Sequence, residues 1–156
     1  MAIEKILYDY LFGLVQAAAG GSALHGASVH KTPYAAIKTS KVIQVGPVAP
    51  DVAPSPGNEE LEEFNGEATL ILLKKVELPA ANADPDNAYA AAREEVLAMA
   101  AAIGLAVIDD NRLGGRVRDA LPVRLPRDFT SIQQQPHAVA NLVLLINQTG
   151  SLVEDK

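Results

Sequence analysis

The chain of 156 residues contains no cysteine and no tryptophan, and aromatic residues make up only 4% of it. Without cysteine the protein has no disulfide bond, no thiol nucleophile and no zinc site with thiolate ligands. No apolar run approaches the roughly 20 residues that cross a bilayer. Basic residues are also in deficit, with 13 Lys and Arg against 19 Asp and Glu and a net charge of −6. This balance disfavours a dedicated nucleic-acid binder, so we expect no membrane partner and no sequence-specific nucleic-acid partner.

The chain is instead rich in aliphatic residues, and hydrophobic residues make up 49% of it. Such a composition can bury a core, and the length suits one domain of the common size of about 100–150 residues. We therefore predict a single domain over residues 1–150 and a loose C-terminal tail over residues 151–156. Glu4 and Asp9 interrupt the first apolar stretch, which disfavours a secretory signal peptide.

Two segments have the periodicity of amphipathic helices. The first, Ile3–Val15, repeats apolar residues at intervals of three and four and ends at Gly20-Gly21. Tyr8 and Phe12 lie off its apolar stripe. The second begins at Asp84-Pro85-Asp86, because an Asp cap followed by proline is a typical helix start. Its predicted end is Gly104, and its predicted buried stripe is Tyr89, Ala92, Val96, Met99 and Ile103.

The predicted strands come in adjacent groups rather than alternating with helices, at residues 34–39, 41–45, 68–76, 105–108, 123–125 and 139–146. This order favours an α+β fold: a mostly antiparallel β-sheet with two main α-helices packed on one face.

A proline-rich, acidic loop over residues 46–66 is inserted between two of these strands. Prolines recur every two to four residues, and acids without a basic neighbour follow them. Because proline blocks helix and interior strand pairing, we expect residues 48–60 to be poorly ordered in an isolated subunit. Two interpretations stay open: an extended surface loop, and an acidic arm that becomes ordered against a partner.

No combination of residues with a known catalytic spacing is present, and we predict no catalytic, metal or cofactor site. His25 and His30 lie five apart without a nearby acid, and the Gly114-Gly115 pair lacks the rest of a phosphate-binding motif. An alternative is a small hydrolase or transferase that uses strand-end carboxylates Asp109 and Asp110 with His137. A further alternative, a nucleic-acid module, would use the arginines near Phe129.

Charge is segregated along the chain. Five of the six arginines lie between residues 112 and 127, whereas the acids gather around residues 59–67. Two different complementary patches suit head-to-tail pairing with copies of the same chain. Aromatic side chains off the core stripe can supply apolar anchors. The predicted interface residues are Tyr8, Phe12, Glu59, Glu60, Glu62, Glu63, Arg112, Arg116 and Arg118.

The pattern over residues 3–147 resembles the tail terminator, or tail-completion, proteins of long-tailed bacteriophages and prophages. The resemblance rests on the first helix, the strand opening at Pro33-Tyr34-Ala35, the long acidic loop and the segment AAREEVLAMAAAIG. Its most distinctive part is Arg112–Asp119, which is similar to the family's Leu-Gly-Gly-x-Val segment. The proline-rich part of the loop is not typical of the family.

The resemblance implies a structural protein rather than an enzyme, with no cofactor. Such proteins form a ring, commonly a hexamer, that caps the tail tube, ends its polymerisation and prepares the tail for joining to the head. The implied partners are further copies of the chain, the tail tube protein and the head–tail connector proteins. The implied location is the virion tail, and the bacterial cytoplasm during assembly.

Overall fold

The computed structural model describes residues 3–21, 24–31, 39–50, 64–79, 84–126 and 129–148. These residues form two helices, α1 (Ile3–Ala18) and α2 (Asp86–Asp109). They also form seven strands: β1 (Ser28–Lys31), β2 (Lys41–Val45), β3 (Ala49–Pro50), β4 (Phe64–Lys75), β5 (Asp119–Pro126), β6 (Thr130–Ile132) and β7 (Gln135–Gln148).

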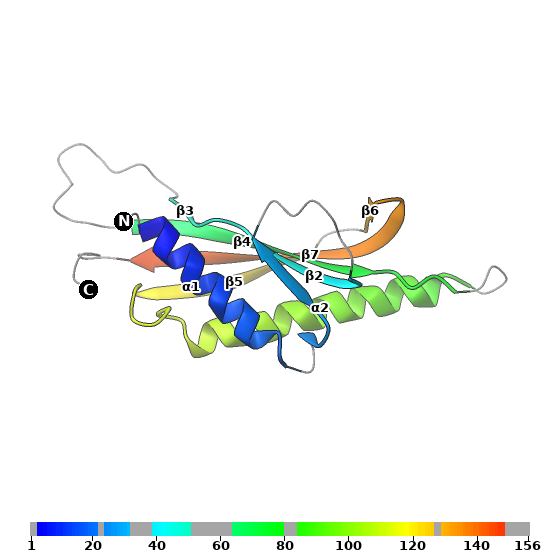
Figure 1. Ribbon diagram of the computed structural model, residues 1–156, viewed down its shortest axis with the longest axis horizontal. Helices are drawn as coiled ribbons and strands as arrows, with labels where there is room; N and C mark the ends of the chain where they lie inside the picture. The colour runs from blue at the N-terminus through cyan, green and yellow to red at the C-terminus, as the bar shows by residue number, and fades with distance from the viewer. Residues whose placement is uncertain are drawn as a thin grey trace.

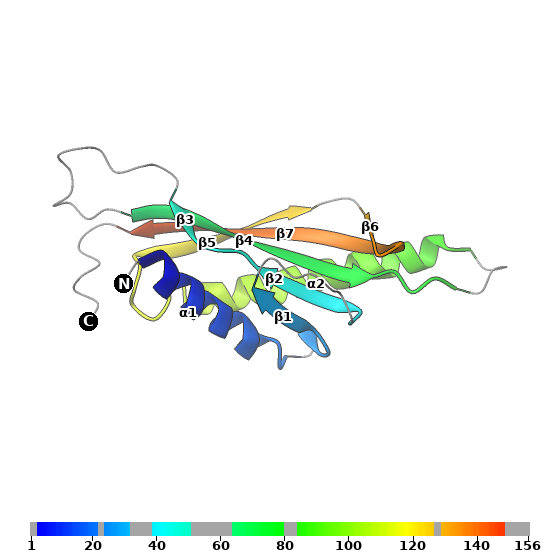
Figure 2. The ribbon, with the colours of Figure 1, turned by 45° about the horizontal axis from the view of Figure 1, so that its top comes forward.

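The strands form one twisted sheet in the order β1-β2-β4-β7-β5, with both helices beneath one face (Figures 1 and 2). Every pairing is antiparallel except that between β1 and β2. The short strand β3 pairs with the beginning of β4, and β6 pairs with the beginning of β7. This architecture confirms the predicted α+β fold, with a mostly antiparallel sheet and two helices on one face.

The core lies between the sheet and the two helices. Because side chains alternate along a strand, every second residue of β4 and β7 points toward the helices. On β7 these buried residues are Ala138, Ala140, Leu142, Leu144 and Ile146. Small alanines beside leucines let α2 approach the sheet closely. The buried residues of the two helices that meet this layer are Leu7, Leu11, Val15, Ala92, Val96, Met99, Ala100, Ile103 and Val107.

The predicted end of the second helix is wrong. Helix α2 continues through Gly104 to Asp109, so the strand expected over residues 105–108 does not exist. Gly104 is buried where α2 passes β5, and a Cβ atom there would lie 3.9 Å from Cγ of Pro122. The glycine therefore serves close packing inside the helix rather than its termination. The predicted start is nearly correct, since the Asp86 N–H donates to Asp84 Oδ1 at 3.0 Å.

The strand predictions differ in their ends. Strand β1 was missed because residues 22–32 lack a clear apolar pattern, and residues 34–38 lie outside the described residues. Strand β7 begins at Gln135, before the predicted residue 139, and β5 extends beyond residues 123–125. Strand β5 includes Pro122 and Pro126, which an edge strand tolerates because a missing N–H can face away from the ladder.

Both ends of the proline-rich loop are built into the sheet. Val48 is buried, and Ala49 and Pro50 pair with Glu67 and Gly66. The expectation of poor order is therefore wrong for residues 48–50, where burial of an apolar side chain and strand pairing hold the chain. Residues 51–63 lie outside the described residues.

Candidate subunit interface

The segment with the Leu-Gly-Gly motif is a tight left-handed turn between α2 and β5. Leu113, Gly114 and Gly115 all have positive φ, at 47°, 70° and 84°. Leu113 adopts this unfavourable conformation with its side chain fully buried, so the core compensates for the backbone strain. The turn is closed by the N–H of Arg116, which donates to the carbonyl of Arg112 at 2.9 Å.

Tyr10 of α1 locks this turn from the side. Its hydroxyl donates a short hydrogen bond to the Asp110 carboxylate, which also accepts the N–H of Gly114 at 2.9 Å. The Arg116 guanidinium lies 4.7 Å from the centre of the Tyr10 ring. A Cβ atom on Gly114 would stand 2.9 Å from the same ring, so the ring itself requires glycine there.

The hydrogen bond between Tyr10 and Asp110 shifts the pKa values of these two residues in opposite directions. The hydrogen bond from Tyr10, and then that from the Gly114 N–H, lower the pKa of Asp110. The same bond to Asp110 raises the pKa of Tyr10, because it favours the protonated hydroxyl. The pair is thus held as a neutral phenol and a charged carboxylate.

The structure brings the three predicted interface arginines to one end of the molecule, but it gives them different surroundings. The side chains of Arg112 and Arg118 are exposed, whereas Arg116 is half-buried against Tyr10. Asp109, Asp110 and Asp119 lie in the same segment and match the three positive charges with three negative ones. This end therefore presents alternating charge rather than a purely basic patch.

Tyr8 and Phe12 lie partly buried against the core, not apart from it as their spacing suggested. Lys31 of β1 lies over both rings, with its Nζ 4.7 Å from the centre of Tyr8 and 5.3 Å from that of Phe12. The Tyr8 hydroxyl donates to the Val45 carbonyl at 3.0 Å. The two rings therefore fasten α1 to the edge of the sheet, and their role in a subunit contact stays a prediction.

Asp9 completes this edge by pairing with Lys5 and Lys31. Hydrogen bonds from Lys31 and then Lys5 lower the pKa of Asp9 to about 2. The four glutamates predicted at the interface, Glu59, Glu60, Glu62 and Glu63, lie outside the described residues.

The residues of the alternative enzyme site are not brought together. Asp109 and Asp110 end α2 near the start of β5, where Asp119 pairs with Asn147. His137 lies ten residues away along β7, roughly 33 Å at the strand rise. Its Nδ1 is 3.0 Å from the Gln135 carbonyl.

The described ranges, residues 3–21, 24–31, 39–50, 64–79, 84–126 and 129–148, hold neither a metal site nor a membrane-spanning helix. In these ranges no group of three or more His, Asp or Glu side chains is placed to hold a metal ion. The two helices found there are also too short or too polar to cross a membrane.

On the outer face of the sheet, opposite the helices, the described residues of β5 and the adjoining end of β7 form an exposed apolar patch, whereas Val42 and Leu73 on the same face are buried. Leu121 on β5 is 57% exposed, and its register partner Leu145 on β7 is 40% exposed. Val123 pairs with Val143 beside them, and Leu125 is also exposed. This surface was not predicted from the sequence, although unbroken apolar runs indicate strands with two apolar faces. The runs in question are Leu70–Leu73 and Leu142–Ile146.

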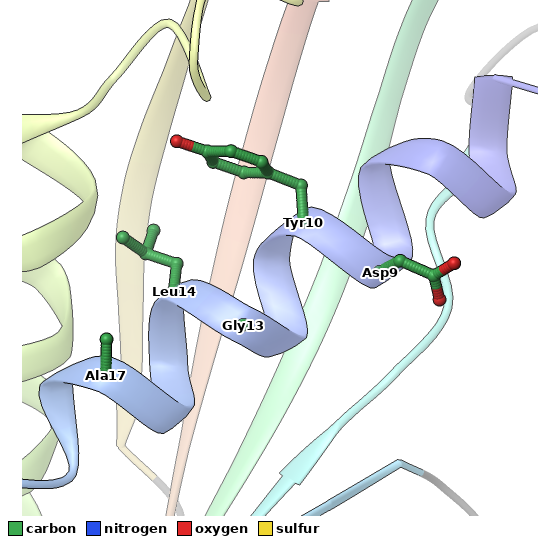
Figure 3. A pocket seen from close by; sticks show the side chains of 5 residues that line it. All are labelled: Asp9, Tyr10, Gly13, Leu14 and Ala17. Atoms are coloured by element: carbon green, nitrogen blue, oxygen red, sulfur yellow. The ribbon is translucent and has the colours of Figure 1, made fainter.

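The helix layer presents a second apolar surface on the opposite side. The exposed side of α2 carries Glu94, Ala98, Ala101, Leu105 and Ile108, spaced by four and three residues. Leu105 is 62% exposed and Ile108 is 55% exposed. A shallow pocket of about 430 Å³ lies along α1 (Figure 3). The residues that line it are Asp9, Tyr10, Gly13, Leu14 and Ala17.

Comparison of the chain with models of known protein families and with curated proteins finds no match.

Proposed function

We propose that the protein is a structural cap of a phage-type tail tube, similar in role to tail terminator proteins. In this role several copies form a ring on the tube end, stop further addition of tube subunits and present a surface to the head–tail connector. The ring acts in the virion tail and needs no cofactor.

The observation that carries this proposal is the open apolar face of the sheet. The largest exposed apolar patch of a monomeric protein, usually a few hundred Å², is often a functional surface. Here Leu121, Leu125 and Leu145 are exposed together on the two neighbouring strands β5 and β7. A protein that assembles with further copies and with a tube needs such a surface. The sequence resemblance indicates that this assembly is the cap of a tail tube.

The test is polymerisation of the tail tube protein from the phage or prophage that carries this gene. We expect the full chain, added in equal amounts, to shorten the tubes and to appear as a ring at their ends in electron micrographs. Tubes of unchanged length with bare ends would overturn the proposal.

A matched pair of arginine variants sharpens this test. Arg112→Glu reverses an exposed charge and should leave the subunit folded while it weakens capping. Arg116→Glu instead places a carboxylate beside Asp110 and should loosen the turn itself. Circular dichroism melting separates the two effects, and equal capping by Arg112→Glu would remove this arginine from the interface.

A further inference from the structure

We propose that neighbouring copies in the ring pack face to face, with the outer sheet face of one copy against the outer helix face of the next. This inference rests on the proposed function and assigns the contact that builds the ring. The occupant of the open sheet face is thus a second copy of this chain, held through its helix α2.

The two apolar surfaces differ and belong to the two opposite layers of the molecule, the sheet and the helices (Figure 2). One consists of Leu121, Leu125 and Leu145 on the sheet, and the other of Leu105 and Ile108 on α2. Two unlike surfaces on opposite sides make a head-to-tail contact, which is the type that generates rings or open stacks. A two-fold dimer would instead leave one surface of each copy uncovered.

The two apolar surfaces also lie at the same level along the length of the molecule. Gly104 of α2 packs against Pro122, and Pro122 lies opposite Leu144 in the ladder. Leu105 is the residue after Gly104, and Leu121 is the residue before Pro122. Copies stacked in the same direction therefore bring Leu105 of one copy onto Leu121 and Leu145 of the next.

Charged residues beside the two apolar surfaces favour stacking in the same direction. On the sheet face, β4 places exposed Glu67 at the Leu145 end and Lys75 eight residues away, toward the opposite end. Exposed Asp109 and Arg112 both lie beyond Ile108, and exposed Glu94 lies toward the other end of α2. Stacking in the same direction sets Arg112 toward Glu67 and Glu94 toward Lys75. Stacking in the opposite direction would instead set Glu94 toward Glu67, which carries the same charge.

The size of the surfaces predicts the strength of the contact. Strand β5 is about 26 Å long and two strands are about 10 Å wide, so the sheet patch covers roughly 260 Å². A stable complex of two proteins buries about 800 Å² on each partner. We therefore expect pairs of subunits to separate in dilute solution and the contact to persist only when a closed ring or the tube end adds further contacts.

Because the natural chain has no cysteine, engineered cysteines can capture this contact in the full-length protein. The variants are Leu105→Cys on the helix face and Leu121→Cys on the sheet face, with one of the two labelled with ¹⁵N. Under mild oxidation we expect the mixed disulfide between the two variants to dominate. Each variant alone should give no more dimer than Ser131→Cys, an exposed control on β6 at the far end of the sheet.

Each other outcome overturns a stated part of the inference. Dimers of Leu121→Cys alone would show sheet-to-sheet packing, and dimers of Leu105→Cys alone would show helix-to-helix packing. Crosslinks between Leu105→Cys and Ser131→Cys would show stacking in the opposite direction. No crosslink above the control, at concentrations where light scattering detects a ring, would place the ring contact elsewhere and leave the proposed function intact.

The double variant Leu105→Cys/Leu121→Cys separates the contact from the cap. A ladder of disulfide-linked species that ends at one size is expected for a ring. A ladder that grows without limit would support the face-to-face contact but contradict the closed cap. A double variant that remains monomeric would contradict the contact.

Discussion

The turn after α2 and the outer face of the sheet differ in how much of each is available to a partner. The turn carries the most distinctive motif of the sequence, yet its polar groups are occupied by one another: Tyr10 with Asp110, Asp110 with Gly114, Arg116 with the Tyr10 ring. The sheet face carries no motif, yet Leu121, Leu125 and Leu145 are exposed. The comparison teaches that a conspicuous motif can serve the fold, while the surface available to a partner is an ordinary row of aliphatic residues.

The two sides of β7 give the largest expected effect. Leu144 is 0% exposed on the helix side, and its neighbour Leu145 is 40% exposed on the outer side. Leu144→Ala should lower the free energy of unfolding by about 2–5 kcal/mol, because a buried leucine leaves a cavity. Leu145→Ala should change it by less than about 1 kcal/mol. Urea unfolding measures both, and equal losses would mean that the outer face is covered in the free subunit.

The two glycines of the turn give the next effect. Both Gly114→Ala and Gly115→Ala force an L-residue into a left-handed conformation, at roughly 1–2 kcal/mol each. Only at Gly114 would the new methyl group meet the Tyr10 ring and Arg116, whereas nothing lies within 4 Å at Gly115. We expect Gly114→Ala to lower the free energy of unfolding by about 1–3 kcal/mol more than Gly115→Ala does. If thermal melts of the two variants coincide, the ring does not hold the turn.

Removal of one hydroxyl should give a smaller loss that depends on pH. Tyr10→Phe keeps the ring under Arg116 but loses the bond to Asp110, at about 1 kcal/mol for a half-exposed pair. Because the pKa of Asp110 is lowered in the folded protein, the stability from this hydrogen bond is fully present above the ordinary pKa of 3.8. It is lost as the pH falls through the pKa of Asp110 in the folded protein. Because the pKa of Tyr10 is raised, the same stability is fully present below the ordinary pKa of 10.0. It is lost as the pH rises through the pKa of Tyr10 in the folded protein.

The difference between wild type and Tyr10→Phe should therefore be constant at neutral pH and shrink at both extremes. Tyr8→Phe is the control, because its hydroxyl donates to a backbone carbonyl that does not titrate in acid. Urea unfolding from pH 2 to pH 11 measures both variants. A difference for Tyr10→Phe that persists unchanged into acid would contradict the pairing with Asp110.

The smallest effect concerns the exposed edge at Asp9. Its pKa of about 2 rests first on Lys31 and then on Lys5. The stability that this carboxylate contributes is present above 3.8 and lost as pH falls through about 2. An NMR titration of the carboxyl carbon should show a larger rise in this pKa for Lys31→Met than for Lys5→Met. The reverse order would mean that Lys5 is its main partner.

The sequence predicted the class of fold and most elements because periodicity reports burial directly. The hydrophobic pattern alone was enough to predict the buried stripe from Ala92 to Ile103 and the last strand. Gly104 misled because glycine ends many helices, and only the approach of Pro122 shows why this one sits inside a helix. The packing of Tyr8 and Phe12 depends on Lys31, which β1 brings from a distance. No local pattern encodes such a contact.

The prolines of the edge strand have a consequence for the behaviour of the protein at high concentration. Strand β5 borders the sheet, and a free border with a full set of N–H donors invites another chain to add a strand and start a fibre. Pro122 and Pro126 remove two donors from that border. A protein that exposes an aliphatic surface is thereby protected against uncontrolled β-aggregation, and its copies are left to meet through their faces.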